Sequence, residues 1–342
     1  MIASMPRARH ELAVGVMAFG LAATLGLSAH MKGLLLDTRD LFVVASFMTF
    51  AAICAWCLLR LGRVGLAFTT LSATALFAII LLALLDTAVL ATQGRPFADP
   101  LFATADSVVA PWLNWYDLAV WFSRHPVASQ LCEWVYHSIA WQPFVLIATL
   151  CWGRRPQETW RFIGMWTLSL MICQMVFALY PGVGAYAFHH VNAALTSPTS
   201  EAVSSGQLRL LTKLRTPSLA IIDNSCIGGI ITFPSFHAVA AALLARGYWR
   251  IPQLRVPFAA LNLAMLATAI PMGGHYVVDL LAGLAVAALA IVIFDAPPFQ
   301  WRGGFRFTST CLISTGDNPV SAGRPNLPSQ SANDRCPRSQ TC

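Results

Sequence analysis

Charged residues are scarce in this sequence, and their scarcity excludes most soluble folds. Only 11% of the 342 residues are Asp, Glu, Lys or Arg, whereas 57% are hydrophobic. A soluble globular domain carries about 25% charged residues. The composition therefore predicts an all-α, polytopic membrane helix bundle, because each span has to satisfy its backbone hydrogen bonds internally.

Lysine is almost absent, since Lys32 and Lys213 are the only two and every other cation is an arginine. The net charge of +7 suggests a nucleic-acid partner at first sight. However, ten of the 22 cations fall on short segments that flank apolar runs, which membrane topology explains. No basic helix with interleaved aromatic residues lies outside those runs, so we expect no nucleic-acid partner.

Metal-ligand spacing is absent as well. The nine cysteines include one Cys-x-x-Cys pair, Cys54 and Cys57. This pair lies inside an uncharged apolar run, where cysteine behaves as a small hydrophobic residue. No other group of cysteines and histidines has the spacing of a metal site. We therefore expect neither a metal nor another cofactor.

Uncharged stretches of about 20 residues, long enough to cross a bilayer, recur along the chain. The first follows Arg7 and Arg9, as in a signal peptide, but its apolar core is long and no clean cleavage site follows it. It is interpreted as a retained helix. We predict eight transmembrane helices in all, at residues 12–30, 41–59, 64–85, 134–152, 162–180, 228–245, 256–272 and 275–294.

Arginine placement predicts the orientation of these helices. With the N-terminus inside, the inner connections carry ten cations, which are Arg7, Arg9, Arg60, Arg63, Arg154, Arg155, Arg161, Arg246, Arg250 and Arg255. Short inner loops are enriched in arginine and lysine, and long loops cross regardless of charge. The long segments 92–133 and 181–227 are therefore expected outside.

Three parts are expected along the chain. Residues 1–62 form two extra N-terminal helices, residues 63–295 form the core, and residues 296–342 form a tail. The stretch 315–342 is rich in Ser, Pro, Asn and Arg and has almost no large apolar side chains. Such a composition is typical of disorder, and the helix count places the tail in the cytoplasm.

A first polar motif, His-Tyr-Val-Val-Asp at 275–279, begins the last apolar run. His275 and Asp279 are four residues apart and share one helical face. An aspartate in a membrane helix costs roughly 2.5–3.5 kcal/mol at the centre and persists when it is paired or functional. If Asp279 accepts from one ring nitrogen, the other nitrogen is free to attack a substrate. The alternative is a polar pair that only holds two helices together.

A second motif, Phe-Pro-Ser-Phe-His at 233–237, begins another apolar run. Pro234 suits the first turn of a helix, because its missing N–H costs nothing there. Ser235 and the first-turn amides are expected to face water, where they favour a phosphate, with His237 just inside. The alternative is an ordinary capped helix start with an incidental histidine.

The two motifs reinforce each other through topology. Residues 238–255 cross inwards and residues 256–272 cross back, so both motifs lie at the outer face. One helical hairpin thus returns His275 towards His237. Two histidines, a serine and a carboxylate at one surface are the groups needed to move a phosphoryl group through a phosphohistidine.

The combination Phe-Pro-Ser-x-His followed by Gly-x-His-Tyr-x-x-Asp-x-x-x-Gly resembles the type 2 phosphatidic-acid phosphatase superfamily. The His-Tyr-x-x-Asp form resembles the branch that contains inositol-phosphorylceramide synthase and its bacterial relatives. The resemblance covers roughly 95–295 and implies a six-helix membrane core. The matching residues are Phe233, Pro234, Ser235, His237, Gly273, His275, Tyr276, Asp279 and Gly283.

The resemblance implies a role for each polar residue. His275 would be the nucleophile, Asp279 would orient it, His237 would protonate the leaving group, and Ser235 would bind a phosphoryl oxygen. The superfamily pattern has an arginine six residues before the nucleophile, where this chain has Ala269. The upstream Lys-x6-Arg-Pro motif is not recognisable either, so two cationic phosphate ligands are unassigned.

A transferring phosphoryl group nevertheless needs cations to balance the charge on its oxygens. The outer segment 205–218 supplies Arg209, Lys213 and Arg215 just upstream of the serine motif. We predict Arg215 as the first phosphate ligand and Lys213 as the second. The alternative is that all three are solvated loop charges.

The expected function is that of a membrane lipid phosphotransferase. It would move a phosphoryl or inositol-phosphate-like group from a phospholipid or sphingolipid to a small alcohol, at the periplasmic face of a bacterial inner membrane. With water as acceptor, the chain would be a lipid phosphate or isoprenoid diphosphate phosphatase. A non-catalytic lipid-binding or transport protein is the remaining alternative, because intramembrane ionisable residues also mark transporters.

Overall fold

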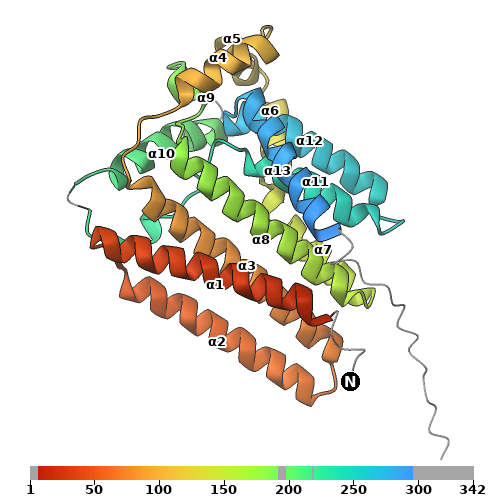
Figure 1. Ribbon diagram of the computed structural model, residues 1–342. Helices are drawn as coiled ribbons and strands as arrows, with labels where there is room; N and C mark the ends of the chain where they lie inside the picture. The colour runs from red at the N-terminus through yellow and green to blue at the C-terminus, as the bar shows by residue number, and fades with distance from the viewer. Residues whose placement is uncertain (1–6, 192–197, 218, 296–342) are drawn as a thin grey trace, which may run out of the picture. The chain divides into compact units, whose positions relative to one another are not determined.

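The computed structural model describes residues 7–191, 198–217 and 219–295, and all of its described helices belong to one compact unit, Met1–Trp301. The predicted tail, 296–342, lies outside the described residues. The helices are α1 Arg7–Lys32, α2 Thr38–Arg60, α3 Val64–Ala91, α4 Asp99–Val109, α5 Trp115–Arg124, α6 Pro126–His137, α7 Gln142–Trp152, α8 Pro156–Leu179, α9 Ala185–Phe188, α10 Pro198–Leu214, α11 Phe236–Trp249, α12 Arg255–Gly273 and α13 Val277–Asp295 (Figure 1).

Six of these helices are long and apolar enough to cross a membrane, and they confirm the expected polytopic α-helical bundle. They are α1, α2, α3, α8, α12 and α13. Each coincides with one of the predicted spans, although α3 runs six residues past the predicted end at residue 85. The chain is therefore an integral membrane protein. The division at residue 62 stays a prediction.

Two of the eight predicted spans are wrong as single long helices. Residues 134–152 divide into the end of α6, a 3-10 turn at Ser138–Ala140, and α7. Pro143 stands in the first turn of α7, where a missing N–H is tolerated, so a new helix starts there. The span predicted at 228–245 starts only at Phe236, with Ser235 as its N-cap.

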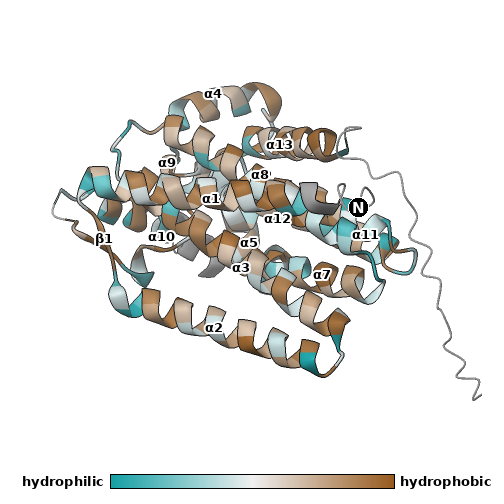
Figure 2. Cartoon of the chain, turned by 60° about the horizontal axis from the view of Figure 1, so that its bottom comes forward, coloured by the Kyte–Doolittle hydropathy of each residue, from teal (hydrophilic) through white to brown (hydrophobic). Residues whose placement is uncertain are grey.

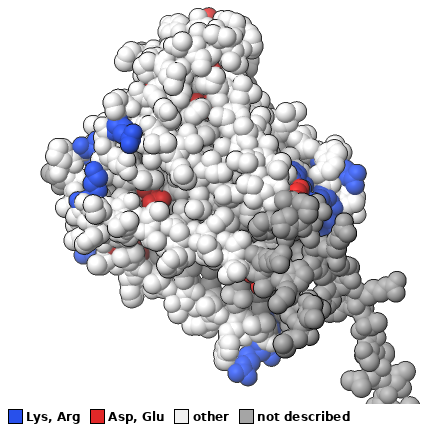
Figure 3. Space-filling view, viewed as in Figure 1, with Lys and Arg blue, Asp and Glu red and all other residues white. Residues whose placement is uncertain are grey.

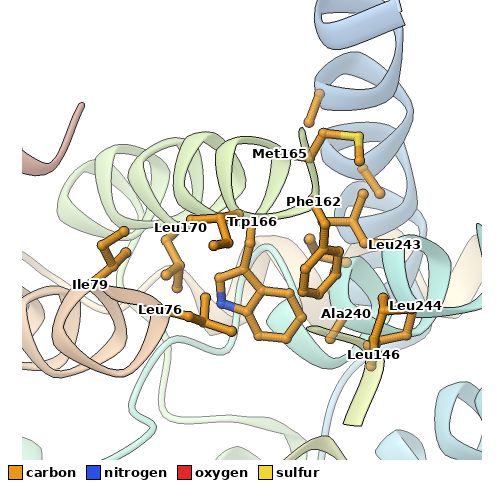
Figure 4. Packing of buried hydrophobic residues seen from close by; sticks show 14 of the residues in the cluster. Leu76, Ile79, Leu146, Phe162, Met165, Trp166, Leu170, Ala240, Leu243 and Leu244 are labelled. Carbon is orange, nitrogen blue, oxygen red and sulfur yellow. The ribbon is translucent and has the colours of Figure 1, made fainter. Parts of the chain in front are cut away.

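The core lies around α8, the most enclosed of the six long helices. Of its most apolar stretch, 61% is buried, compared with 11% for α2. Trp166 and Phe162 point from α8 into a cluster of aliphatic side chains from α3, α7 and α11, as Figure 4 shows. Helix α11 packs against α7 and α8, and Phe236 of the second motif contacts Trp166, so this packing positions α11.

Helix α2 packs along α3 and turns most of its surface outwards. Its exposed large side chains include Phe42, Phe50 and Trp56. Figure 2 shows hydrophobic residues along the middle of the long helices and hydrophilic ones mainly towards their ends. In a bilayer such apolar surface faces lipid, which explains why it needs no protein cover.

The long helices have two chemically different ends. We call the arginine end the one at which α8 and α12 begin and α11 and α13 finish; it carries Arg161, Arg246, Arg250 and Arg255. The histidine end is the opposite one, where α11 and α13 begin. Figure 3 shows Lys and Arg at the left, right and lower edges of the molecule, with a nearly uncharged surface between them.

A short strand pair joins two distant segments outside the helices. Leu35–Leu36 (β1) pairs in parallel with Ile221–Ile222 (β2), and the amide of Asn224 donates to Asp40 at 2.7 Å. The connection between α1 and α2 therefore lies beside the segment after α10. Segment 181–227 was predicted outside, and an inner N-terminus places the connection after the first span outside as well; the pairing requires that the two share one side.

Candidate active site

The structure brings the two polar motifs together at the histidine end. His237 lies in the first turn of α11, and His275 lies in the short connection between α12 and α13. Their ring centroids are 6.1 Å apart. The amide of Ser235 donates to the carbonyl of Asp279 at 3.0 Å, so the backbone of one motif is attached to the other.

His275 and Asp279 form a buried pair. Nδ1 of His275 is 3.3 Å from Oδ2 of Asp279, and the Asp279 side chain is fully buried. The same oxygen accepts the amide of Tyr276 at 3.0 Å. If Asp279 is ionised, its carboxylate can only accept hydrogen bonds; Nδ1 of His275 then carries the hydrogen, and the lone pair is on Nε2.

The helical face predicted for this pair needs a correction. Helix α13 begins at Val277, so His275 precedes the helix and lies in the turn that enters it. The two side chains are close nevertheless, because Asp279 lies in the first turn of α13 and its carboxylate contacts both His275 and the amide of Tyr276. A helix start, rather than a helix face, thus creates the pair.

The predicted environment of Ser235 is also wrong. Pro234 is not in the first turn of α11 but precedes its N-cap, and Ser235 does not face water, because it is fully buried. Its Oγ accepts from the amide of Ala238 at 3.5 Å, as an N-cap does. A Cβ on Gly283 would lie 2.3 Å from the Ser235 carbonyl oxygen, so glycine allows α13 to approach this closely.

His237 lies between aromatic rings and the other histidine. Its ring stacks on Tyr136 at a centroid distance of 4.0 Å. Its Nε2 is buried and has no hydrogen-bond partner among the described residues. A Cβ on Gly273 would meet the His275 ring at 2.8 Å and Tyr136 at 3.1 Å. This nitrogen is therefore buried with unused hydrogen-bonding capacity, in a ring that neighbours His275.

Two buried carboxylates of α4 hold the segments around His275. Asp106 accepts the amide of Val278 at 2.9 Å and so caps the start of α13. Asp99 accepts the amides of Val183 and Gly184 at 2.9 and 3.0 Å. Burial raises the pKa of Asp99, and these two hydrogen bonds oppose the rise. Gly184 in turn lies against the carbonyl of Gly274, next to His275.

The role of Asp99 was missed in the sequence. The available signal was Asp99-Pro100, shortly after the turn Gly94-Arg95-Pro96. This pattern marks a helix start, but it does not indicate which segment the Asp99 carboxylate binds. The Tyr-Pro-Gly-Val-Gly stretch at 180–184, which Asp99 holds, is 84 residues further along the chain. No pattern in the sequence relates two such segments.

The two predicted phosphate ligands contact other residues than the histidines. Lys213 is exposed and paired with Asp223 at 3.5 Å. The hydrogen bond from Ser225, with Lys213 beside it, lowers the pKa of Asp223 to about 2 against the effect of burial. Arg215 is half-buried, and its guanidinium stacks 3.9 Å from the Phe97 ring centroid. Its partial burial lowers its pKa.

Ala269, which stands at the position of the superfamily arginine, is fully buried in the packing around Tyr136 and Met272. Within the described ranges, no group of three His, Cys, Asp or Glu side chains is arranged to hold a metal ion. The site therefore consists of an oriented histidine, a second histidine with a free buried nitrogen, and buried carboxylates that fix the surrounding backbone.

Comparison with known proteins assigns this arrangement to a family. The model of the PAP2 superfamily matches residues 106–293, which is more than half of the chain and includes both motifs. The chain belongs to the PAP2 superfamily. Membership indicates phosphatase or phosphotransferase chemistry on lipid phosphates. The search of curated proteins and the search of solved structures found no match.

Proposed function

We propose that this protein is a membrane lipid phosphotransferase that works through a phosphohistidine on His275. The observation that carries the proposal is the contact of 3.3 Å between Nδ1 of His275 and buried Asp279, which leaves Nε2 as the free nucleophile. His237, whose ring lies 6.1 Å away, supplies the acid. The PAP2 superfamily match supports the reaction class.

The reaction proceeds in two displacements at phosphorus. In the first, the Nε2 lone pair forms a P–N bond, the P–O bond to the leaving alcohol breaks, and protonated His237 gives that oxygen its proton. In the second, now neutral His237 takes the proton of the acceptor hydroxyl, whose oxygen attacks phosphorus. The P–N bond then breaks, and its electron pair returns to His275.

Charge stabilisation is assigned to the outer segment and to Ser235. Arg215 is the preferred phosphate ligand, because its guanidinium stacks on an aromatic ring and the structure gives it no acidic partner among the described residues. Lys213 ranks second, because Asp223 already engages its ammonium group. Ser235 would donate its hydroxyl hydrogen to a phosphoryl oxygen, because its Oγ already accepts from Ala238.

The donor is a phospholipid or sphingolipid, and a small alcohol is the acceptor that we propose. The His-Tyr-x-x-Asp motif supports this preference through its resemblance to the inositol-phosphorylceramide synthase branch. An inositol-phosphate-like group is accordingly the first candidate for the transferred unit. The same intermediate with water as acceptor would give a lipid phosphate or isoprenoid diphosphate phosphatase.

Product analysis with competing acceptors tests the proposal. The purified full chain is incubated with labelled phospholipids while the concentration of inositol or another polyol is raised. We expect product to divert from hydrolysis to transfer, while donor consumption stays nearly constant if formation of the intermediate is limiting. Brisk hydrolysis without any alcohol product would leave a phosphatase, and no donor turnover at all would contradict an enzymatic role.

The location that we propose is a bacterial inner membrane with the site facing the periplasm. Arginine placement supports this orientation, as does the pairing of β1 with β2 on one side. Single cysteines at Thr216 and Gln253, in a background without native thiols, test it in spheroplasts with an impermeant reagent. Labelling of Thr216→Cys alone is expected, whereas labelling of Gln253→Cys alone would reverse the orientation.

A further inference from the structure

A polar cavity of about 330 Å³ lies at the arginine end. The turn between α7 and α8, the first turns of α8, the end of α11 and His10 of α1 line it. Helix α13 has 19 residues and so places about 28 Å between this end and His275. The cavity is therefore separate from the histidine site. Its charged lining residues are Arg154, Arg155, Glu158, Arg161 and Arg250.

The charges around this cavity do not balance. Glu158 accepts from Arg161 at 3.4 Å and from Arg250 at 2.5 Å, and it is the one acid in the lining. The lining therefore has four guanidinium groups against one carboxylate, an excess of three positive charges. Asp295, near the rim, pairs with Arg161 and also with Arg246, so it neutralises only part of this excess.

Two of the four arginines have no acidic partner among the described residues, although both line the cavity. Arg155 donates to the carbonyl of Arg250 at 3.0 Å, which joins the α7–α8 turn to the end of α11. For Arg154 the structure shows no ion pair within the described residues. Membrane topology explains arginines at this end of the protein, but not their convergence on one cavity.

The backbone of Arg154 adds an independent observation. Its φ is +54°, in the left-handed region that glycine favours. The amides of Arg154 and Arg155 donate to Cys151 and Leu150 at 3.0 and 2.9 Å, so α7 ends in a Schellman motif with Arg154 at its left-handed position. An arginine in place of the expected glycine puts a guanidinium at the cavity, at a cost in backbone conformation.

We propose that this cavity binds a phosphate-bearing anion, either the headgroup of an anionic lipid or a free phosphate. Guanidinium groups bind phosphate oxygens in a bidentate manner, and basic pockets between transmembrane helices are known to bind anionic headgroups. The proposal does not depend on the activity assigned to the histidine end. A lipid ligand at the arginine end would come from the leaflet opposite to the one at the histidine end.

Thermal unfolding of the full chain in neutral detergent tests this proposal. The probes are dioleoyl phosphatidylglycerol, dioleoyl phosphatidylcholine, sodium phosphate, and sodium chloride at matched ionic strength. The proteins are wild type, Arg154→Gly, and the control Arg63→Gly. Arg63 is exposed, lies on the turn between α2 and α3, and makes no side-chain capping bond. Both variants lose one cation, but only the first removes it from the cavity.

We expect phosphatidylglycerol to raise the wild-type unfolding midpoint by roughly 3–8 °C over phosphatidylcholine at about 100 times its Kd. Arg154→Gly should lose this shift while its midpoint without ligand stays equal or rises, because glycine accepts the left-handed conformation. Arg63→Gly should keep the shift. A shift with phosphatidylglycerol alone supports a lipid headgroup, and a shift with phosphate as well supports the anion itself.

Three results would overturn the proposal. The first is no shift in the wild type with either phosphate probe. The second is an unchanged shift in Arg154→Gly, which would place the bound anion elsewhere. The third is an equal loss in Arg154→Gly and Arg63→Gly, which would reduce the effect to net charge.

Discussion

The two ends of the bundle use carboxylates in opposite ways. At the histidine end, Asp99, Asp106 and Asp279 are buried and accept hydrogen bonds from backbone amides. At the arginine end, Glu158 and Asp295 are partly exposed and pair with guanidinium groups. The first arrangement orients short backbone segments beside the His275 ring, whereas the second sets the local charge.

This difference has a physical reason. A carboxylate that accepts hydrogen bonds from backbone amides is stabilised by their dipoles and needs no cationic side chain as a partner. Such a carboxylate therefore brings no additional cation beside the histidines that would compete for a phosphate. It also fixes the connections of the chain, because each amide belongs to a turn or a helix start. At the arginine end, an excess of cations remains available for an anion. The predictions below separate orientation from charge.

The largest effect is expected for His275→Ala. Loss of a covalent nucleophile should lower turnover of lipid phosphate by several orders of magnitude, to below about 1% of wild type, while the protein still inserts. Turnover is measured as donor consumption in detergent. His125→Ala, at an exposed histidine stacked on Trp121, is the control and should stay active. Activity above that level would exclude His275 as the nucleophile.

A smaller loss is expected for Arg215→Ala. If Arg215 binds the phosphoryl oxygens, its removal should cost about 2–4 kcal/mol in kcat/KM. Arg209→Ala is the matched control, because Arg209 is exposed and contacts Ser205 at 3.1 Å. The two variants are compared in steady-state kinetics with one lipid donor. Small and equal losses would show that both are solvated loop charges.

Asp106→Ala should produce a moderate effect at the histidine end. Removing the cap of α13 should lower the free energy of unfolding by about 1 kcal/mol and also lower kcat, because His275 lies just before that helix. Asp106→Asn keeps an oxygen acceptor and should recover most of both values. Denaturation and kinetics are measured on the same samples. If both variants lose kcat equally, the charge of Asp106 matters rather than its cap.

The smallest effect is expected for Asp295→Asn at the arginine end. It leaves Arg161 and Arg246 without this carboxylate and should cost about 1 kcal/mol of unfolding free energy, since all three side chains are partly exposed. The value of kcat should not change, because the reaction takes place about 28 Å away. A parallel fall in kcat would indicate that the two ends are coupled.

Hydropathy predicted the long helices well, because each residue of a span that faces lipid has to be apolar. The spans at 41–59 and 256–272 match α2 and α12 to within a few residues. The prediction of one helix at 134–152 failed, because two short helices in series have the same composition as one long helix. Pro143 was the only local sign of the break.

The motifs predicted which polar side chains lie together but not their surroundings. His275 and Asp279 meet, and His237 lies near them, as expected from a hairpin of two helices that returns one motif towards the other. The burial of Ser235 was not predicted, because it depends on Gly283 of another helix, which lets α13 approach the Ser235 backbone. Close approach between distant segments leaves no periodic pattern.

The sequence by itself determined that this chain spans a membrane with helices and carries its two histidine motifs at one end of the bundle. Composition and short motifs suffice for that, because hydrophobic length and side-chain chemistry are local properties. Only the tertiary structure decided that Asp99 and Asp106 hold the segments around His275 and that four arginines line one cavity. Those arrangements depend on contacts between residues far apart in the chain, and packing alone selects which of them form.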